Sequence, residues 1–461
     1  MSKPNPYMTG IFAPVQEERT HSNLKVKGEL PRELSGHYLR NSPNPQFTPK
    51  GRYHWFDGDA MIHGMHFENG TASYKNRYVK TKHFQMEQQA GEPLWTGIME
   101  PVNEASPDGP DKDTANTSII YHNGKVLSLW WLGGQPYQIG LADLETKGEE
   151  TFGGTLKCGV AAHPKVDPVT GEMVFFDFSQ FDAPYLTHGV ISKDGKVVKT
   201  ATIDIPGPRL FHDIAITANY TILMDLPLVW HEGKLAEGRR LTFFDQSLPS
   251  RFGIFPRHGN SGDIRWFETD PCYIFHTINA WEEEDSIILY ACRIENPIPG
   301  RRFEQGVSRI ELLQLKPVLC QFKFNLKTGQ TTYNILDDRY TEFPRMNDDH
   351  LARKSRYSYH PRLARDSQLL FDALIKYDLQ TGQSVTHEFG PGRFGSEPVF
   401  VPRVRDAAED DGFVLTYIYD TVRQEWEVSV IDGKSFAKEP LAAVQIPCRV
   451  PIGFHAAWAP N

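Results

Sequence analysis

Four histidines in this sequence stand in settings that suit metal binding. Three of them follow a phenylalanine in apolar runs, LFHDIAIT, YIFHTINAW and IGFHAAWAP, and these are His212, His276 and His455; the fourth, His163, lies in VAAHPKVDPVTGEM. Neutral imidazole is a ligand for iron, copper, nickel and zinc, and four imidazoles leave positions open on an octahedral ion for substrate or oxygen. The four are too far apart for a local motif such as HExxH. Their spacing alone favours independent core histidines, each held by one hydrogen bond.

The segments that must position these histidines have the pattern of β-strands. Short apolar or alternating runs of strand length recur along the chain, among them SIIYH, EMVFFDF, YTILMDL, DSIILYAC and GFVLTYIYD. Asn-Gly, Asp-Gly or Thr-Gly pairs in many of the turns supply the positive φ that tight hairpins need. These turns are FENGT at 67, YHNGK at 121, DPVTGE at 167, SKDGK at 192, NLKTGQ at 325, DLQTGQ at 378 and IDGK at 431.

The hairpin signals continue from end to end without a Pro/Ser-rich linker. We therefore expect a single domain over residues 1–461, built by radial repetition of antiparallel sheets in the manner of a β-propeller. Inner strands of a propeller end near one axis, so distant histidines would converge there. Helical periodicity is weak, and residues 136–147 and 345–357 are expected to be short helices or loops.

Composition narrows the classes of function and location. Lys+Arg 49 against Asp+Glu 58 gives a net charge of −9, and without a long basic run this argues against a nucleic-acid partner. The five cysteines are scattered and never form CxxC, which argues against a disulfide framework or a zinc ribbon. No signal peptide pattern and no run of about 18 apolar residues is present, so a cytoplasmic protein is expected.

Several motifs give the chain a specific resemblance to a known family. Together with the four histidine settings they occur in family order over essentially the whole chain; they are YLRNSPNPQF, WFDGDAMIHGMHF, ANTSIIYHNGK, EFPRMN and SEPVFVPR. The sequence thereby resembles the carotenoid cleavage oxygenases. The resemblance implies an all-β, seven-bladed β-propeller with a cap of loops and short helices over the metal face. It also implies a ferrous iron, Fe(2+), held on the axis by His163, His212, His276 and His455.

The family also implies carboxylates that support the ligand rings. Glu342 of EFPRMN and Glu397 of SEPVFVPR match two of them. A ring N–H given to a carboxylate fixes the imidazole tautomer and raises its basicity as a ligand. Without the resemblance, both acids would be interpreted as structural or solvated.

The third carboxylate of the family is absent from its expected position. In LSLWWLGG that position holds Trp131, whose indole N–H can only donate a hydrogen bond and cannot accept one from a ligand imidazole. We expect weaker iron retention as a result. Relatives that cleave phenolic substrates tend to carry a lysine just before this position, where the chain has Trp130. Trp130 is therefore predicted to line an apolar substrate tunnel.

The resemblance implies a dioxygenase that uses O2 to split a carbon–carbon double bond into two carbonyl products, without a reductant or organic cofactor. The preferred substrate is a hydrophobic alkene of the carotenoid or apocarotenoid class. The alternative is the side-chain alkene of a stilbene or of a 4-vinyl- or propenyl-phenol, which would give vanillin-type aldehydes. The rival classes are a metal-free binding propeller and a zinc or calcium hydrolase, and the latter would need carboxylate and amide ligands.

Three further expectations concern the surroundings of the site. A membrane-partitioning substrate predicts peripheral membrane contact, with LPLVWHEGKL at 226–235 as the candidate apolar patch and an ordinary strand and turn as the alternative. His276 is expected to end an inner strand, with the acids Glu282 to Asp285 in a solvated loop beyond it. The sequence leaves open whether the chain is a monomer or a homodimer.

Overall fold

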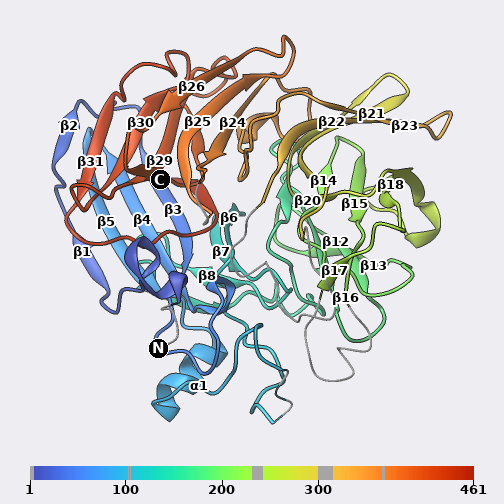
Figure 1. Cartoon of the computed structure of the whole chain (residues 1–461), viewed down its shortest axis with the longest axis horizontal. Helices are drawn as coiled ribbons and strands as arrows, with labels where there is room; N and C mark the ends of the chain where they lie inside the picture. Colours follow the sequence, from blue (N-terminus) through green and yellow to red (C-terminus); the bar gives the residue numbers. More distant parts are fainter. Residues whose placement is uncertain (1–4, 102, 104, 231–241, 299–314, 366–368) are drawn as a thin grey trace. The chain divides into compact units, whose positions relative to one another are not determined.

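The computed structural model describes residues 5–101, 103, 105–230, 242–298, 315–365 and 369–461. These residues are mostly antiparallel β-structure (Figure 1), which confirms the all-β expectation. The chain divides into two compact units. Of the described residues, those in 5–151 and 387–461 form unit 1, and those in 152–230 and 242–386 form unit 2.

Unit 1 contains three antiparallel sheets and the helix α1. The first sheet joins the two ends of the chain, because β3 pairs with both β4 and β32. In spatial order its strands are β1 (Arg19–His21), β5 (Thr71–Tyr78), β4 (Ala60–Glu68), β3 (Gly36–Pro43) and β32 (Ala456–Pro460). The second sheet is β6 (Ser118–His122), β7 (Lys125–Leu129), β8 (Tyr137–Ile139) and β9 (Thr146–Glu149). The third has β2 (Val26–Gly28), β31 (Ala442–Ile446), β30 (Glu425–Asp432) and β29 (Gly412–Asp420), with β27 (Arg393–Gly395) and β28 (Val399–Pro402) both paired to β29.

Unit 2 contains three four-stranded sheets and two hairpins. The first sheet is β10 (Lys165–Val166), β11 (Met173–Phe178), β12 (Leu186–Ile191) and β13 (Val197–Thr202). The second is β14 (Ala215–Ile216), β15 (Tyr220–Asp225), β18 (Ser250–Pro256) and β19 (Arg265–Thr269). The third is β20 (Tyr273–Glu283), β21 (Ser286–Ile294), β22 (Val318–Asn325) and β23 (Thr331–Ile335). The hairpins are β16 (Leu228–Trp230) with β17 (Thr242–Phe244), and β24 (Tyr357–Leu363) with β25 (Phe371–Asp378). The strand β26 (Ser384–Glu388) spans the boundary between the units in sequence.

The turn chemistry explains the hairpins. Asn69 and Gly70 join β4 to β5 with φ values of 50° and 74°, and Asn123 and Gly124 join β6 to β7 with 50° and 71°. Positive φ at both central residues is the type I′ geometry that matches the twist of adjacent strands. The IDGK turn is different, because Gly433 has no positive φ and residues 433–441 form a longer connection between β30 and β31.

Helical structure is the part of the fold that the sequence predicted worst. The expectation for residues 136–147 is wrong, because they contain β8 and the start of β9. Residues 345–357 agree with theirs, since they form a loop with the 3-10 turn η7 (Asp348–His350) up to the start of β24 at Tyr357. The α-helix of the described residues is α1 (Lys82–Ala90), which begins where Thr81 Oγ1 accepts from Phe84 N at 3.0 Å and ends at Gly91 with φ 72°. Only His83, Phe84 and Glu87 of this helix are buried, so it lacks the apolar periodicity that would reveal it. The short 3-10 turns are η1 (Pro6–Met8), η2 (Gly10–Phe12), η3 (Trp55–Asp57) and η4 (Ser261–Asp263).

Face-to-face packing of the sheets holds their strands in place. In unit 1, buried residues of the first and third sheets share one core that includes Tyr38, Tyr74, Phe413 and Val430. A second core, around Ile62 and the residues of β6 to β8, joins the first sheet to the second. Large aromatic side chains supply much of the buried apolar area, so the packing of these sheets is expected to be rigid.

Candidate metal centre

Three of the four predicted ligands lie together in unit 2. His163 precedes β10, His212 precedes β14, and His276 lies in β20. Their ligand nitrogens lie within 4.8 Å of one another. His212 Nε2 is 3.3 Å from His276 Nε2, and the ring of His163 lies 4.7 Å and 5.0 Å, centroid to centroid, from those of His212 and His276. Imidazole nitrogens gathered in this way suit an ion of iron, copper, nickel or zinc.

A break in the β-ladder positions His276. Ile274 pairs with Arg293 and Thr277 pairs with Ala291, so the two residues between them on β20 face only Cys292 on β21. This is a β-bulge, which re-aims side chains and is common beside active sites. The expectation that His276 ends its strand is wrong, because β20 continues to Glu283. The bulge aims the ring into the histidine cluster from within the strand.

The acid run is a solvated loop only in part, because Glu284 and Asp285 form an exposed turn whereas Glu282 and Glu283 belong to β20. Glu282 ends β20 and accepts hydrogen bonds from Thr217 Oγ1 at 2.6 Å and from Asn219 N at 3.0 Å. Burial raises the pKa of Glu282, but these hydrogen bonds outweigh burial and leave the pKa below its usual value. Glu283 lies 2.6 Å from Lys354. Glu282 therefore links the end of β20 by hydrogen bonds to the turn before β15.

Glu342 supports the ring of His276. Its side chain is fully buried and its Oε2 accepts a hydrogen bond from His276 Nδ1 and another, at 2.6 Å, from Phe343 N. The segment is held against β24 because Arg345 and Tyr359 exchange backbone hydrogen bonds. Phe343 itself has φ 54°, an uncommon conformation for a bulky residue. A carboxylate only accepts, so the proton of this imidazole is on Nδ1 and its Nε2 is available to a metal.

The same arrangement occurs in unit 1 at His455, which immediately precedes β32. His455 Nδ1 lies 3.0 Å from Glu397 Oε1, and Ala456 N donates to Glu397 Oε2 at 2.5 Å. Both His455 and Glu397 are buried. The backbone of His455 is held on both sides, since its carbonyl accepts from Asn41 N and its N–H donates to the Thr117 carbonyl.

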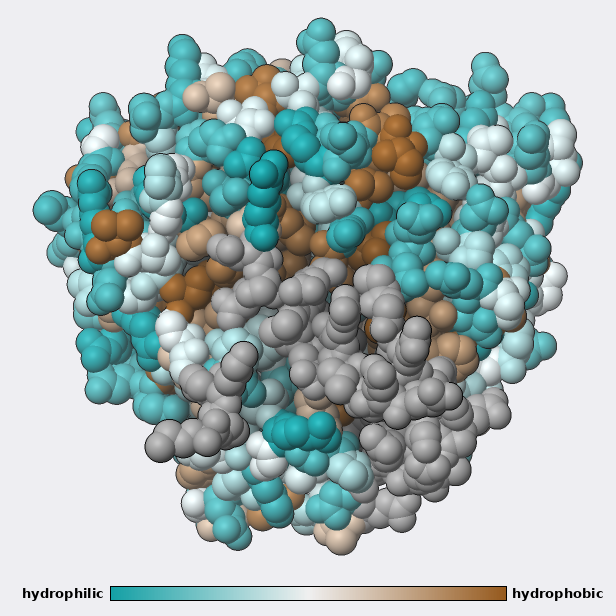
Figure 2. Space-filling view, viewed as in Figure 1, coloured by the Kyte–Doolittle hydropathy of each residue, from teal (hydrophilic) through white to brown (hydrophobic). Residues whose placement is uncertain are grey.

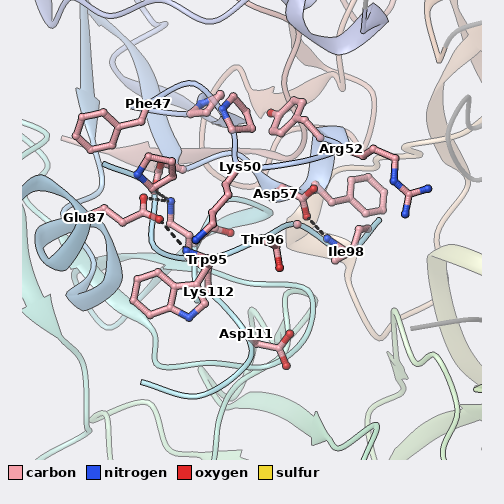
Figure 3. Close-up of a pocket in the computed structure, with 18 of the residues that line it drawn as sticks. Phe47, Lys50, Arg52, Asp57, Glu87, Trp95, Thr96, Ile98, Asp111 and Lys112 are labelled. Carbon is pink, nitrogen blue, oxygen red and sulfur yellow. Dashed lines mark hydrogen bonds and ion pairs between the residues drawn. The ribbon is translucent and has the colours of Figure 1, made fainter. Parts of the chain in front are cut away.

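Trp131 and Trp130 line a pocket in unit 1. The backbone N–H of Trp131 donates to Thr117 Oγ1 at 3.1 Å, while both indole N–H groups are buried without a hydrogen-bond partner among the residues that the structure describes. Phe47, Trp95 and Ile98 contribute to the same wall (Figure 3). No sequence pattern predicted that residues 93–98 line this pocket, because they lie in a loop of mixed composition after α1.

One buried charged group also reaches this pocket. Lys112 Nζ lies 2.7 Å from Asp59 Oδ1 and 2.7 Å from Glu87 Oε2. Lys112 and Glu87 are labelled in Figure 3. Burial lowers the pKa of Lys112, but the two carboxylates outweigh burial and raise the pKa above its usual value. Because Lys112 is committed to two carboxylates, it is a poor anchor for a phenolate.

The described part of the candidate membrane patch, residues 226–230, is buried. Leu228 and Trp230 are 1% and 6% exposed and lie in the hairpin of β16 and β17, so their proposed insertion into a bilayer is wrong; residues 231–235 lie outside the described residues. Hydrophobic residues on the face in Figure 2 form separate patches among hydrophilic ones. Among the described residues, no helix has the length and apolar character needed to span a membrane.

Comparison with known proteins identifies relatives over the full length of the chain. Residues 12–460 match the family model described as Retinal pigment epithelial membrane protein. The carotenoid 9,10(9',10')-cleavage dioxygenase 1 of Pisum sativum is 40% identical over 99% of this chain and 90% of its own length. The carotenoid cleavage oxygenase of Mycobacterium tuberculosis is 33% identical over 99% and 98% of the two chains.

Solved structures also resemble this chain over nearly its full length. The lignostilbene dioxygenase of Pseudomonas brassicacearum is 28% identical, with a TM-score of 0.90 over 99% of both chains. A variant of the Synechocystis apocarotenoid oxygenase is 27% identical, with a TM-score of 0.85 over 97% of both chains. A cobalt-substituted form of the Synechocystis enzyme has a TM-score of 0.83.

We expect Glu342→Gln to weaken metal binding by about tenfold to a hundredfold, because the amide is a weaker acceptor for the His276 N–H than the carboxylate. The measurement is a Co²⁺ titration of metal-free protein in competition with a chelator. Glu282→Gln is the matched control, since Glu282 is a carboxylate on the same strand as His276 but bonds to Thr217 and Asn219. Equal affinities of the two variants would show that Glu342 does not support the ligand.

Proposed function

The chain belongs to the carotenoid cleavage oxygenase family and is therefore a dioxygenase that cleaves carbon–carbon double bonds, and we propose that it uses Fe(II) and O2 to split a carotenoid or apocarotenoid into two carbonyl products. The observation that carries the proposal is the histidine cluster of unit 2, in which the ring of His276 is held by a buried carboxylate. A metal-free binding propeller would have no need for such support of the ring.

We further propose that His455 is the fourth ligand and that residues 1–461 form one seven-bladed propeller with a cap of loops and short helices. Two observations support this. Glu397 holds His455 as Glu342 holds His276, so both rings have the same support from a buried carboxylate. The full-length similarity to solved structures of a family known as β-propellers is consistent with the single domain.

The donor set fits iron. Four neutral imidazoles suit a divalent transition metal and do not suit calcium or magnesium, which prefer oxygen ligands. When bound, Fe(II) supplies the redox chemistry that activates dioxygen. The protein supplies the positions of the rings through Glu342 and Glu397, and an aromatic pocket that holds an alkene away from water.

The aromatic part of the pocket favours an apolar substrate. Trp130, Trp131, Phe47 and Phe56 present ring surfaces, and Lys112 is neutralised by its two carboxylates; Lys50, Arg52, Asp57 and Asp111 add charged groups to the rest of the lining. The alternative substrate, a stilbene or a 4-vinyl- or propenyl-phenol, is supported by the TM-score of 0.90 with the lignostilbene dioxygenase. We also propose a cytoplasmic location, with no nucleic-acid partner.

Incubation of the iron-loaded protein with a β-apocarotenal in air should give shortened polyene aldehydes, identified by mass. The same protein should be offered 4-hydroxystilbene and 4-vinylguaiacol in parallel, with chelator-treated protein as the control. Aromatic aldehydes as the only products would establish the alternative substrate class. Turnover of none of the three compounds would contradict both.

We expect Trp131→Glu to slow the loss of iron to a chelator, because a carboxylate at this position can accept a ring N–H and an indole cannot. Trp131→Phe is the control, since it removes the indole without adding an acceptor and should leave the rate of iron loss unchanged. The measurement is the time course of iron transfer to a coloured chelator. An unchanged rate for Trp131→Glu would show that the missing carboxylate does not limit iron retention.

A further inference from the structure

A buried carboxylate connects the three chain segments that carry the histidines of unit 2. Asp213 follows His212 directly, and its side chain is 1% exposed. Two of its partners are Lys165, two residues after His163, and Thr277, the residue after His276. A single side chain therefore touches a close neighbour of each of the other two ligands.

The contacts of Asp213 use both carboxylate oxygens. Oδ1 lies 2.6 Å from Lys165 Nζ and accepts from Ile214 N at 2.7 Å. Oδ2 accepts from Thr277 N at 2.7 Å and from Thr277 Oγ1 at 2.8 Å. Four donors satisfy a buried carboxylate and fix its orientation, because each lost donor would leave part of a buried charge without a partner.

Strand pairing does not fix the positions of the three histidines relative to one another. His163, His212 and His276 belong to segments of three different sheets, which begin with β10, β14 and β20. No ladder hydrogen bond among the described strands joins these three sheets to one another. Sheet packing is less directional than hydrogen bonding, so the spacing of three ligand atoms needs directional contacts near the ligands themselves.

We propose that Asp213 is a positioning residue of the metal centre. It sets the relative positions of His163, His212 and His276 through Lys165 and Thr277, without touching the metal. This inference rests on the proposed metal-binding function. Sequence motifs did not reveal it, because Lys165, Asp213 and Thr277 have no local pattern in common.

The test is Asp213→Asn, which keeps the size of the side chain but replaces one acceptor oxygen by an NH2 group. In either orientation the amide loses its contact with Lys165 or with Thr277. We expect about tenfold to a hundredfold weaker Co²⁺ binding in competition with a chelator, as for other changes to groups that orient metal ligands. We also expect a changed visible spectrum of the bound Co²⁺, which reports coordination geometry.

Glu150→Gln is the matched control. Glu150 is also a buried carboxylate paired with a lysine, Lys125, but it belongs to unit 1 and lies next to no ligand histidine in sequence. This variant should bind Co²⁺ as the wild type does. Equal Co²⁺ affinity and an unchanged spectrum in a folded Asp213→Asn protein would overturn the inference.

A second pair of variants covers the case in which Asp213→Asn does not fold. Thr277→Ser keeps the hydroxyl that donates to Asp213 and should retain wild-type affinity, whereas Thr277→Val removes it and should bind Co²⁺ several-fold more weakly. Equal affinities for these two variants would contradict the inference. Absence of Co²⁺ binding by the wild type would instead refute the proposed metal centre.

Discussion

The site depends on the hydrogen bond between a buried imidazole and a buried carboxylate. Glu342 and Glu397 are both almost wholly removed from solvent, and each accepts from one ring N–H and one backbone N–H. Loss of the ring N–H would leave a buried carboxylate with one donor fewer, at a cost of about 1–3 kcal/mol. Rotation of either ring would break that hydrogen bond, so His276 and His455 are each held with Nδ1 directed at the carboxylate.

The candidate ligands lie where regular β-structure is interrupted. His163, His212 and His455 immediately precede or lie close before β10, β14 and β32, and His276 lies at a bulge inside β20. Beside Glu342, Phe343 has a positive φ that the surrounding hydrogen bonds maintain. A regular strand would send neighbouring side chains to alternate faces with its own ladder spacing, which does not match the geometry of a metal ion. In an irregular segment the ligand side chain does not have to follow the strand spacing. The flanking sheets hold the ends of each such segment in place.

The sequence revealed the parts of this structure that depend on local chemistry. Asn-Gly turns such as Asn69–Gly70 predict hairpins because few residue types adopt positive φ. The helix α1 was missed because it buries too few side chains to show a period. The position of His276 was misjudged because a bulge leaves no mark in an apolar run, and Glu282 was misjudged because its partners, Thr217 and Asn219, lie far away in sequence.

The candidate ligands themselves were identified by resemblance to a family, since spacing alone favoured independent core histidines. The burial of Leu228 and Trp230 was not predictable either, because an apolar run has the same sequence pattern whether it faces a core or a membrane. Contacts between distant charged residues, such as those of Asp213, have no signature in one sequence.

Trp131 stands at a position where the family resemblance implies a glutamate, and the two side chains place different demands on a buried site. A buried glutamate at this position would need a donor for its charge, whereas the indole adds a large apolar surface to the pocket wall and leaves only a weakly polar N–H to bury. The pocket wall thereby gains apolar surface. Under the proposed function, the ligand ring that this carboxylate would hold in the family must be oriented by other contacts. Asp213 supplies such contacts in unit 2, because it accepts from the backbone N–H groups of Ile214 and Thr277 and does not need the acceptor that Trp131 lacks.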